Sequence, residues 1–552
     1  MEKRFFLALL LTGVVLVVTP LLVGRPPATP VVSSPTSATQ GGRTDSGAVT
    51  AGAAGRAAVG APGRDAGARP ATAEIAPPET TMVRTASATM TLLSRGAAPT
   101  RVTLAELRSL SPASKGAAVE LADGSQPLLR FRILAASDTV SLADVPFHVT
   151  PGGPDAAGVV RFESVGNAPA TTIEYQPADP YRTHVRVRTA AGGRAYLLAE
   201  LPTSLASQEA DTLDDIRHLA FAAKPVHGNA RGITFASVDP GERKLVAGPI
   251  SWAVTKTKYF VIGLLSESDS TPFAELDVTG ALRDGKLARH ASGTVVIPLV
   301  NGAANFDLYA GPQSWERMRA IGREFETANP YGGFLQPIVQ PFATIVMRIM
   351  LWMKRVVKLD YGWVLVIFGF AIRVLLWPLN QSAMRSSIRM QRVQPEIAAV
   401  QERYKNDKEK LQQEIMRVYQ DHGMSPFAAL SGCLPALIPM PVFFALFFVF
   451  QNTIEFRGVP FLWLSDISLH DPLYVLPLLT GASMFLLSWI GMRNLPKNPQ
   501  STTMLYLMPG IFTMFLLNTA SGLSIYYLVQ QIAAIPQQWM IANERRKAQS
   551  TR

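Results

Sequence analysis

The stretch YGWVLVIFGFAIRVLLWPL, residues Tyr361–Leu379, is the segment around which the rest of the chain is organised. It is apolar enough to cross a bilayer, and at about 1.5 Å of helical rise per residue it is long enough to do so. One residue, Arg373, interrupts it with a charge that arginine keeps in proteins. A charge near the bilayer centre costs from about 3 to about 10 kcal/mol or more. The groups that stabilise Arg373 are therefore central to the function.

Further apolar runs predict that this stretch is the first span of a five-span helical core, 361–541. The spans are expected at 361–379, 429–450, 473–491, 504–517 and 523–541. Residues 1–23 form another apolar run behind Lys3 and Arg4. Because no small-residue cleavage site follows it, we expect an uncleaved membrane anchor, with a cleaved signal peptide as the alternative. The chain is thus expected to cross the membrane six times.

The region between the anchor and the core consists of segments that differ in composition and in the pattern of apolar residues. Residues 24–81 are rich in Ala, Thr, Pro, Gly and Ser, which predicts a flexible linker. From 82 to 330, short runs of alternating apolar and polar residues, separated by Gly, Pro, Asp and Asn, predict an all-β sandwich domain. Near its end Gln313–Thr327 has a helical pattern. Residues 334–358 have apolar side chains at helical spacing among basic ones, which is typical of an amphipathic helix on a membrane surface.

A polar segment follows the first span of the core. Residues 382–423 predict a helical hairpin with arms at 384–404 and 408–422 and with Asn406–Asp407 as the turn and helix N-cap between them. The second arm aligns Leu411, Ile415 and Tyr419 on one face. The charged surface of this hairpin is either a solvated face or, at a membrane mouth, a surface that also contacts incoming chains.

Lys and Arg in the short loops predict the orientation. They are concentrated in the hairpin, in the 491–503 loop and in the 542–552 tail, whereas the 452–472 loop has Arg457 against three acidic residues. Both termini are therefore expected in the cytoplasm and the β domain outside it. In a bacterium with two membranes, this places the chain in the inner membrane and the β domain in the periplasm.

Composition excludes several classes of protein. The 552-residue chain has a net charge of +11 and is 48% hydrophobic, and its basic residues flank apolar runs. That pattern favours a membrane surface over nucleic acid. Cys433 is the only cysteine, so an internal disulfide cannot form. The sequence has no phosphate-binding loop, metal-ligand cluster or nucleophile elbow. We therefore expect no enzyme activity, no cofactor and no metal.

Two interpretations of Arg373 remain open on these residues alone. None of the five predicted spans of the core contains Asp or Glu, so no carboxylate within them can neutralise the guanidinium. Arg373 can extend to the nearby headgroups, or it can face a hydrated cavity. Polar and aromatic side chains on other spans favour the second interpretation: Ser431 on 429–450, and Tyr526, Tyr527, Gln530 and Gln531 on the last span. The lack of carboxylates argues against a proton-coupled transporter.

Three segments give the chain a resemblance to a known family. They are FAIRVLLWPLNQSAMRSSIRMQRVQPEI (370–397), MSPFAALSGCLPALIPMPVFFALFFVF (424–450) and SGLSIYYLVQQ (521–531). They resemble the YidC membrane protein insertases of Gram-negative bacteria, within the Oxa-type insertase superfamily. The resemblance implies an insertase and chaperone that inserts nascent membrane proteins, alone or with the Sec translocon, and that also contacts the ribosome and membrane lipids. It also implies a β-supersandwich for the outer domain.

The resemblance also implies roles for particular residues. Arg373 would lie in a hydrophilic groove open to the cytoplasm and to lipid. The other groove or client-contacting residues would be Tyr526, Tyr527, Gln531, Met440, Pro441 and Phe443. The hairpin and the basic tail would face the ribosome. One departure is Gly369, where some relatives have a hydroxyl residue, which leaves a polar partner for Arg373 at that level in doubt.

The sequence leaves two alternative hypotheses, each from another class of protein. A secondary transporter with an anion site at Arg373 would predict internal repeats, and the sequence has no convincing one. A membrane-anchored, sugar-modifying β domain would need a histidine and a carboxylate facing one cleft, and it would leave the five-span core unexplained.

Overall fold

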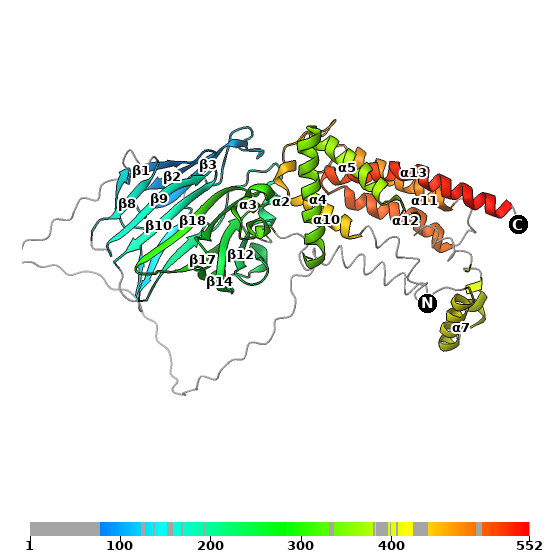
Figure 1. Ribbon diagram of the computed structural model, residues 1–552, viewed down its shortest axis with the longest axis horizontal. Coiled ribbons are helices and arrows are strands. Elements are labelled where there is room, and N and C mark those ends of the chain that lie inside the picture. Colours follow the sequence, from blue (N-terminus) through cyan, green and yellow to red (C-terminus); the bar gives the residue numbers. More distant parts are fainter. Residues whose placement is uncertain are drawn as a thin grey trace, which may run out of the picture. The chain divides into compact units, whose positions relative to one another are not determined.

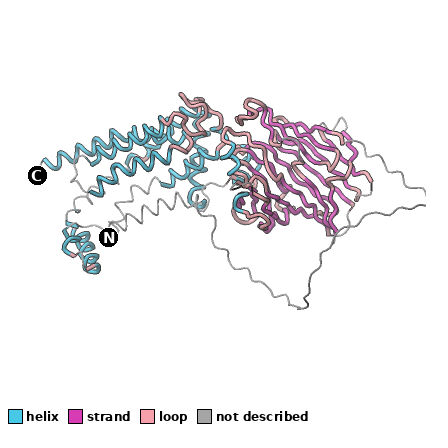
Figure 2. Tube along the Cα trace, turned by 180° about the vertical axis from the view of Figure 1, so that it is seen from behind, coloured by secondary structure: helices cyan, strands magenta, loops and turns pink. Residues whose placement is uncertain are grey.

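The computed structural model describes residues 78–550, except for a set of gaps. The gaps are 123–126, 136–137, 152–157, 167–168, 191–193, 284, 286, 330–335, 379–380, 382–392, 394–395, 398, 405–406, 423–439 and 493–498. The predicted anchor 1–23, most of the linker 24–81 and most of the first hairpin arm 384–404 lie outside the described residues. The strands belong to the first part of the described chain and the long helices to the second (Figure 2).

The first part is a β domain, as the alternating pattern predicts. Its strands are β1 (Thr80–Arg84), β2 (Ala88–Leu93), β3 (Ala98–Arg108), β4 (Ala118–Glu120), β5 (Arg130–Ala135), β6 (Asp138–Ser141), β7 (Phe147–Pro151), β8 (Val160–Ser164), β9 (Thr171–Asp179), β10 (Arg182–Thr189), β11 (Ala195–Leu201), β12 (Ala220–Pro225), β13 (Arg231–Thr234), β14 (Arg243–Lys256), β15 (Phe260–Ser266), β16 (Phe273–Gly280), β17 (Ala291–Pro298) and β18 (Ala303–Pro312). Within them buried and exposed positions alternate, as in β11, because successive side chains of a strand point to opposite faces.

The strands form one small and one large antiparallel sheet around a common core. The small sheet has the order β1-β2-β3-β4, and the 14-stranded sheet follows β6-β5-β11-β17-β16-β14-β15-β18-β10-β9-β8-β7, with β12 and β13 joined to β14. Strand β14 changes partners along its length. Arg243–Ala247 pair with β16, and Trp252–Lys256 pair with β12 and β15. This change of partner lets the large sheet enclose one hydrophobic cluster.

Short helices complete the β domain. They are α2 (Thr212–Arg217) and α3 (Trp315–Ile321), together with the 3-10 turns η1 (Phe235–Ser237) and η2 (Phe325–Ala328). The single helix expected at 313–327 is divided, because Gly322 adopts a φ of 87° and ends α3. The chain then turns so that Phe325 packs edge-on against Trp252 and Tyr309 of the sheet.

The second part of the described chain is helical. Its helices are α4 (Gln336–Val357), α5 (Tyr361–Leu375), α7 (Lys408–Asp421), α10 (Met440–Asn452), α11 (Val475–Met492), α12 (Pro499–Leu516) and α13 (Ser521–Ser550), with the turn η4 (Ile454–Phe456). Figure 1 shows α5 beside α13 and α4 beside α10. Helix α12 begins before the expected 504–517 span, and α5 ends before Leu379, with Leu376 as its C-cap.

Among the described residues, α11 alone is both long and apolar enough to cross a membrane. Shorter apolar helical stretches are Tyr361–Leu375, Phe443–Asn452 and Leu505–Leu516. The first residues of the expected 429–450 span lie in the gap 423–439, so α10 is described only from Met440.

Polar contacts join the β domain to the end of α10 and to the turn η4 that follows it. The amide of Asn329 accepts a hydrogen bond from the buried Lys256 ammonium at 2.8 Å and donates one to the carbonyl of Asn452 at 3.2 Å. The hydroxyl of Ser314 donates to Glu455 at 3.0 Å. Burial raises the pKa of the Glu455 carboxyl. Lys256, Asn329 and Asn452 are buried, and Ser314 and Glu455 are half-buried, so their pairing contributes to the stability of the folded chain.

The described part of the hairpin agrees with its sequence pattern. Asp407 caps α7 by accepting from the backbone N–H of Lys410 at 3.2 Å. On the inner face of α7, Tyr419 and Ile415 pack in a small cluster with Val393 and Ile397. The predicted N-cap and the predicted apolar face are therefore both confirmed.

Candidate functional site around Arg373

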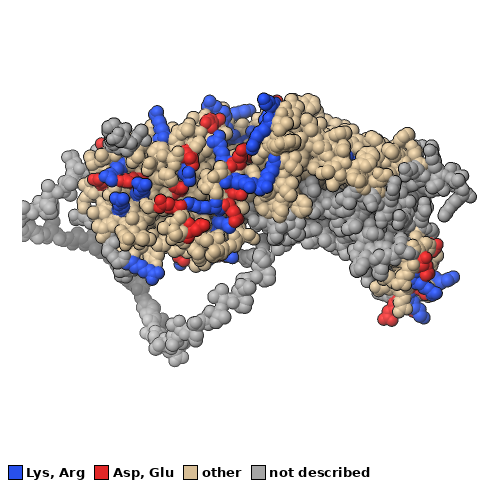
Figure 3. All heavy atoms as spheres, in the orientation of Figure 1, with Lys and Arg blue, Asp and Glu red and all other residues tan. Residues whose placement is uncertain are grey.

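Helix α5 has two different apolar faces. One face is buried in the helical core, and the other is exposed. The buried face includes Val364, Leu365 and Phe368, and the exposed one includes Trp363, Ile367, Phe370 and Val374. On the face drawn in Figure 3, charged side chains gather over the β domain and around α7, whereas the helical region is mostly uncharged. The exposed apolar face of α5 indicates contact with lipid.

Arg373 lies in the last turn of α5 and is half-buried against α13. Its guanidinium donates to Oε1 of Gln537 at 2.7 Å. Its Nε is buried without a hydrogen-bond partner among the described residues. A neutral amide is therefore the described hydrogen-bond partner of a full charge, which leaves that charge available to another group.

Two glutamines on α13 hold this helix against α5. The side chain of Gln530 donates to the carbonyl of Gly369 at 2.7 Å, and that of Gln537 donates to the carbonyl of Trp377 at 3.3 Å. A Cβ at Gly369 would lie 3.2 Å from Val529, so glycine permits this close approach. Gln530 therefore binds the backbone of Gly369, whereas the hydrogen-bond partner of the Arg373 guanidinium is Gln537.

Sequence reasoning missed Gln537. It lies seven residues after Gln530, and positions seven apart fall on the same helix face. This spacing could have identified both glutamines as one polar stripe facing α5.

The predicted aromatic residues come together beside this stripe. Tyr527 packs against Phe512 with ring centroids 5.1 Å apart and against Phe443 at 5.6 Å. Tyr526 packs against Phe368 of α5 at 5.9 Å. Gln531 is half-buried on the same helix. Met440 and Pro441 begin α10, but their side chains lie outside the described part of the chain.

The described part of the β domain contains two histidine–carboxylate pairs, His184–Asp307 and His218–Asp214, the second with Nδ1 3.8 Å from Oδ1. Nδ1 of His184 contacts the buried carboxylate of Asp307, which also accepts from Arg182 at 3.2 Å. A surface cavity of about 560 Å³ lies nearby on β8, β9, β10 and β18, but neither His184 nor Asp307 lines it. Over the described residues, no group of His, Cys, Asp and Glu could hold a metal ion.

The exposed apolar helices and the all-β domain define a membrane protein with a large domain outside its helical core. Two family models match the chain in succession. The YidC periplasmic domain matches residues 80–345, and the 60Kd inner membrane protein family matches residues 352–549. The chain belongs to the YidC family.

Relatives of known name agree with this assignment. The chain is 34% identical over 293 residues to the membrane protein insertase YidC of Anaeromyxobacter sp. (strain Fw109-5), covering 53% of this chain and 51% of the relative. It is 29% identical to that of Anaeromyxobacter dehalogenans (strain 2CP-1 / ATCC BAA-258), covering 71% and 70%. The chain thus spans about half the length of the first relative and more of the second.

Two solved structures are also similar at low identity. An active YidC insertase with its first transmembrane domain resolved is 18% identical, with 84% of this chain and 95% of that chain covered and a TM-score of 0.33. A galactose mutarotase-like protein from Lactobacillus casei is 12% identical, with 42% and 100% covered and a TM-score of 0.30.

Proposed function

We propose that the chain is a membrane protein insertase, and not an enzyme, that passes nascent membrane proteins into the bilayer beside Arg373. The observation that supports this most is the pairing of Arg373 with an amide, Gln537, and not with a carboxylate. Its charge is only partly compensated, so it can attract an acidic residue of an incoming chain. The names of the relatives support the same activity.

The physical mechanism follows from the cost of moving polar groups through lipid. Desolvation of a client's polar segment is the main barrier. A hydrated groove that reaches Arg373, beside the packed helices α5 and α13, would shorten the apolar path. The client's apolar segment then moves into lipid along the exposed faces of the helices, and this partitioning drives insertion.

The orientation is part of the proposal. The distribution of Lys and Arg supports cytoplasmic termini and an inner-membrane location with the β domain in the periplasm. In that orientation the hairpin around α7 and the basic tail face the ribosome, and the Sec translocon is a candidate partner in the membrane. No specific nucleic-acid sequence is recognised in this scheme.

Insertion of acidic-tailed clients in cells depleted of their own insertase tests the proposal. Arg373→Ala should reduce insertion at least about tenfold, because the charge that attracts the client is lost. Arg373→Lys is the matched control and should retain a substantial part of the activity, because it keeps the charge. Unchanged insertion with Arg373→Ala would refute the electrostatic role, and solute flux through purified protein in liposomes would instead favour a transporter.

A further inference from the structure

Two tight turns in the loop between α10 and α11 carry large apolar side chains that project from the protein. The first turn is Phe461–Leu464, and the second is Asp471–Tyr474. We propose that these two turns insert their tips into the headgroup region of the bilayer, so that the loop is a lipid-binding element at this end of the helical core. The tip residues are Leu462, Trp463, Leu473 and Tyr474.

The first turn is closed by backbone hydrogen bonds. The N–H of Phe461 donates to the carbonyl of Leu464 at 3.0 Å, and the N–H of Leu464 donates back at 2.9 Å. Phe461 and Leu464 are buried in the helical core, whereas Leu462 at the tip is 68% exposed. Leu462 also has a φ of 52°, a left-handed conformation that is unfavourable for leucine. The fold therefore holds this side chain outward in spite of its backbone preference.

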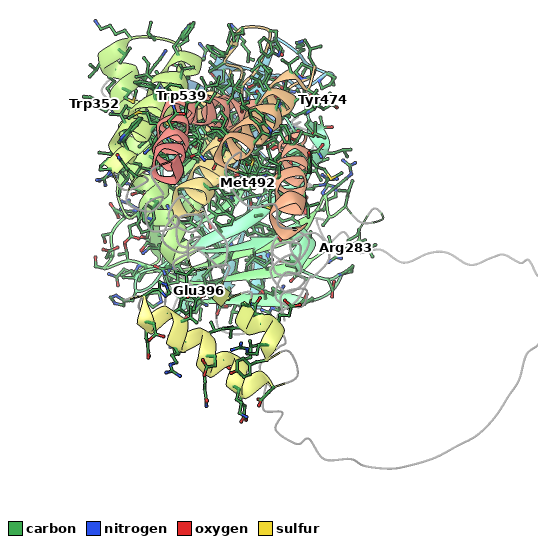
Figure 4. All side chains as sticks on the ribbon, turned by 90° about the vertical axis from the view of Figure 1, so that its right-hand side faces the viewer. Arg283, Trp352, Glu396, Tyr474, Met492 and Trp539 are labelled. Carbon is green, nitrogen blue, oxygen red and sulfur yellow. The ribbon has the colours of Figure 1, made fainter. Side chains whose placement is uncertain are left out.

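The second turn repeats the arrangement. Tyr474 has a φ of 56°, and its N–H donates to the carbonyl of Asp471 at 3.1 Å. Leu473 beside it is 63% exposed. Helix α11 begins at the next residue, Val475, so this tip lies at the end of an apolar helix. Figure 4 labels Tyr474 and Met492, which stand at the two ends of α11.

One buried aspartate connects the turns. Oδ1 of Asp471 accepts from the indole N–H of Trp463 at 3.1 Å and from the backbone N–H of Leu473 at 3.0 Å. Its Oδ2 accepts from the N–H of Leu476 at 2.8 Å. Asp471 is itself fully buried. The two tips are therefore fixed relative to each other and to the start of α11, as a preformed binding surface requires.

Lipid is the occupant that the position of the loop favours. Phe461 packs edge-on against Trp363 in the first turn of α5, with ring centroids 5.3 Å apart, so the first tip also adjoins an apolar helix. Trp and Tyr are enriched where a membrane meets water, because their rings are apolar and their N–H or O–H is polar. Leu462, which is held outward at an unfavourable backbone angle, and the exposed Leu473 gain nothing from water, but both gain from burial in lipid.

Fluorescent labels on single cysteines test this proposal in liposomes. The background is the full chain with Cys433→Ser, and the label is placed at Leu462→Cys or Leu473→Cys. Leu245→Cys is the control, since Leu245 is exposed on strand β14 of the β domain. Lipids with a nitroxide near the headgroup should quench both loop labels at least about twofold more than the control, because interfacial residues lie at that depth.

Aqueous iodide should give the opposite order, with the strongest quenching at Leu245→Cys. Iodide quenching of both loop labels as strong as at the control, without quenching by the spin-labelled lipid, would overturn the proposal. Labels shielded from both quenchers would assign the tips to a protein surface and would overturn it as well. None of these results depends on insertase activity, so the proposed function can fail separately.

Discussion

The guanidinium of Arg457 forms an ion pair with the carboxylate of Glu209, and its Nε donates to Oε1 at 2.8 Å and to Oε2 at 3.0 Å. Arg457 belongs to the loop after α10, and Glu209 belongs to the β domain. Arg457 also donates to the carbonyls of Arg108 and Gln208 at 2.9 Å each. Both charged side chains are more than nine-tenths buried. The loop and the β domain are thus joined by a desolvated ion pair with additional hydrogen bonds.

Arg457→Ala should destabilise the folded chain by about 3–5 kcal/mol, because it leaves the Glu209 charge buried without its partner. Thermal unfolding in detergent measures the effect. Arg132→Ala is the control, because the Arg132–Glu200 pair is about one-third exposed and should be worth less than about 1 kcal/mol. Equal effects of the two substitutions would contradict the importance of the buried pair.

The pH dependence of stability should reveal the protonation of Glu209. Burial raises its pKa to about 7, although the charge of Arg457 lowers it. Between its ordinary pKa near 4.5 and about 7, the folded state holds more protons than the unfolded one. The contribution of Glu209 to stability therefore falls as the pH rises through that window, and it is constant above it.

Glu209→Gln removes this titration. The natural chain should therefore be more stable relative to Glu209→Gln at pH 5 than at pH 8. The melting temperature of the natural chain minus that of Glu209→Gln should be larger at pH 5, and the change should correspond to about 1–3 kcal/mol of unfolding free energy. The subtraction removes the titration of other groups, including Glu455. A difference that is the same at both pH values would show that the pKa of Glu209 is not raised.

Asn329→Leu should destabilise the chain by about 2–4 kcal/mol, because Lys256 loses its amide partner. Burial lowers the pKa of Lys256 to about 8, so the ammonium is already costly. The effect of Asn329→Leu should shrink as the pH rises above 8, where the folded state holds an uncharged amine. Adding Lys256→Met should recover much of the loss. Asn305→Leu, an exposed asparagine on β18, is the control and should be nearly neutral.

The sequence was sufficient for the architecture because the relevant signals are local. Alternation along β11 and the helical spacing in α7 depend only on which face of each element is buried. Asp407 was identifiable as an N-cap for the same reason, since its carbonyl and side chain act within one turn.

The contacts between distant segments could not be predicted from such local patterns. Arg457 and Glu209 are 248 residues apart, and each occurs in an ordinary polar stretch. Gln537 became relevant only when α13 was packed against α5. Such pairs are specified by tertiary packing, which a single sequence does not display. Arg373, Tyr526 and Tyr527 could be predicted from the sequence, because polar groups in apolar runs are rare and therefore easy to identify.

Gly362→Ala should destabilise the helical core by about 1–3 kcal/mol, because overpacking forces neighbouring groups apart. A Cβ at Gly362 would lie 2.0 Å from the ring of Phe461. Gly510→Ala in α12 is the matched control, since nothing lies within 4 Å of its Cβ. The control should be neutral or stabilising by up to about 1 kcal/mol, because alanine favours helix. Equal melting temperatures of the two variants would contradict the close contact.

Gln537→Glu tests whether the charge of Arg373 must be free to act on clients. The new carboxylate would lie where an amide oxygen is now 2.7 Å from the guanidinium, so it would form a fixed ion pair. Insertion of acidic-tailed clients should then fall to nearly the level of Arg373→Ala, although Arg373 is still present and the folded core is retained. Gln537→Leu is the control. It removes the amide and should cost about 1–3 kcal/mol of stability, but it leaves the charge available and should preserve insertion per folded molecule. Normal insertion with Gln537→Glu would mean that clients do not use this charge.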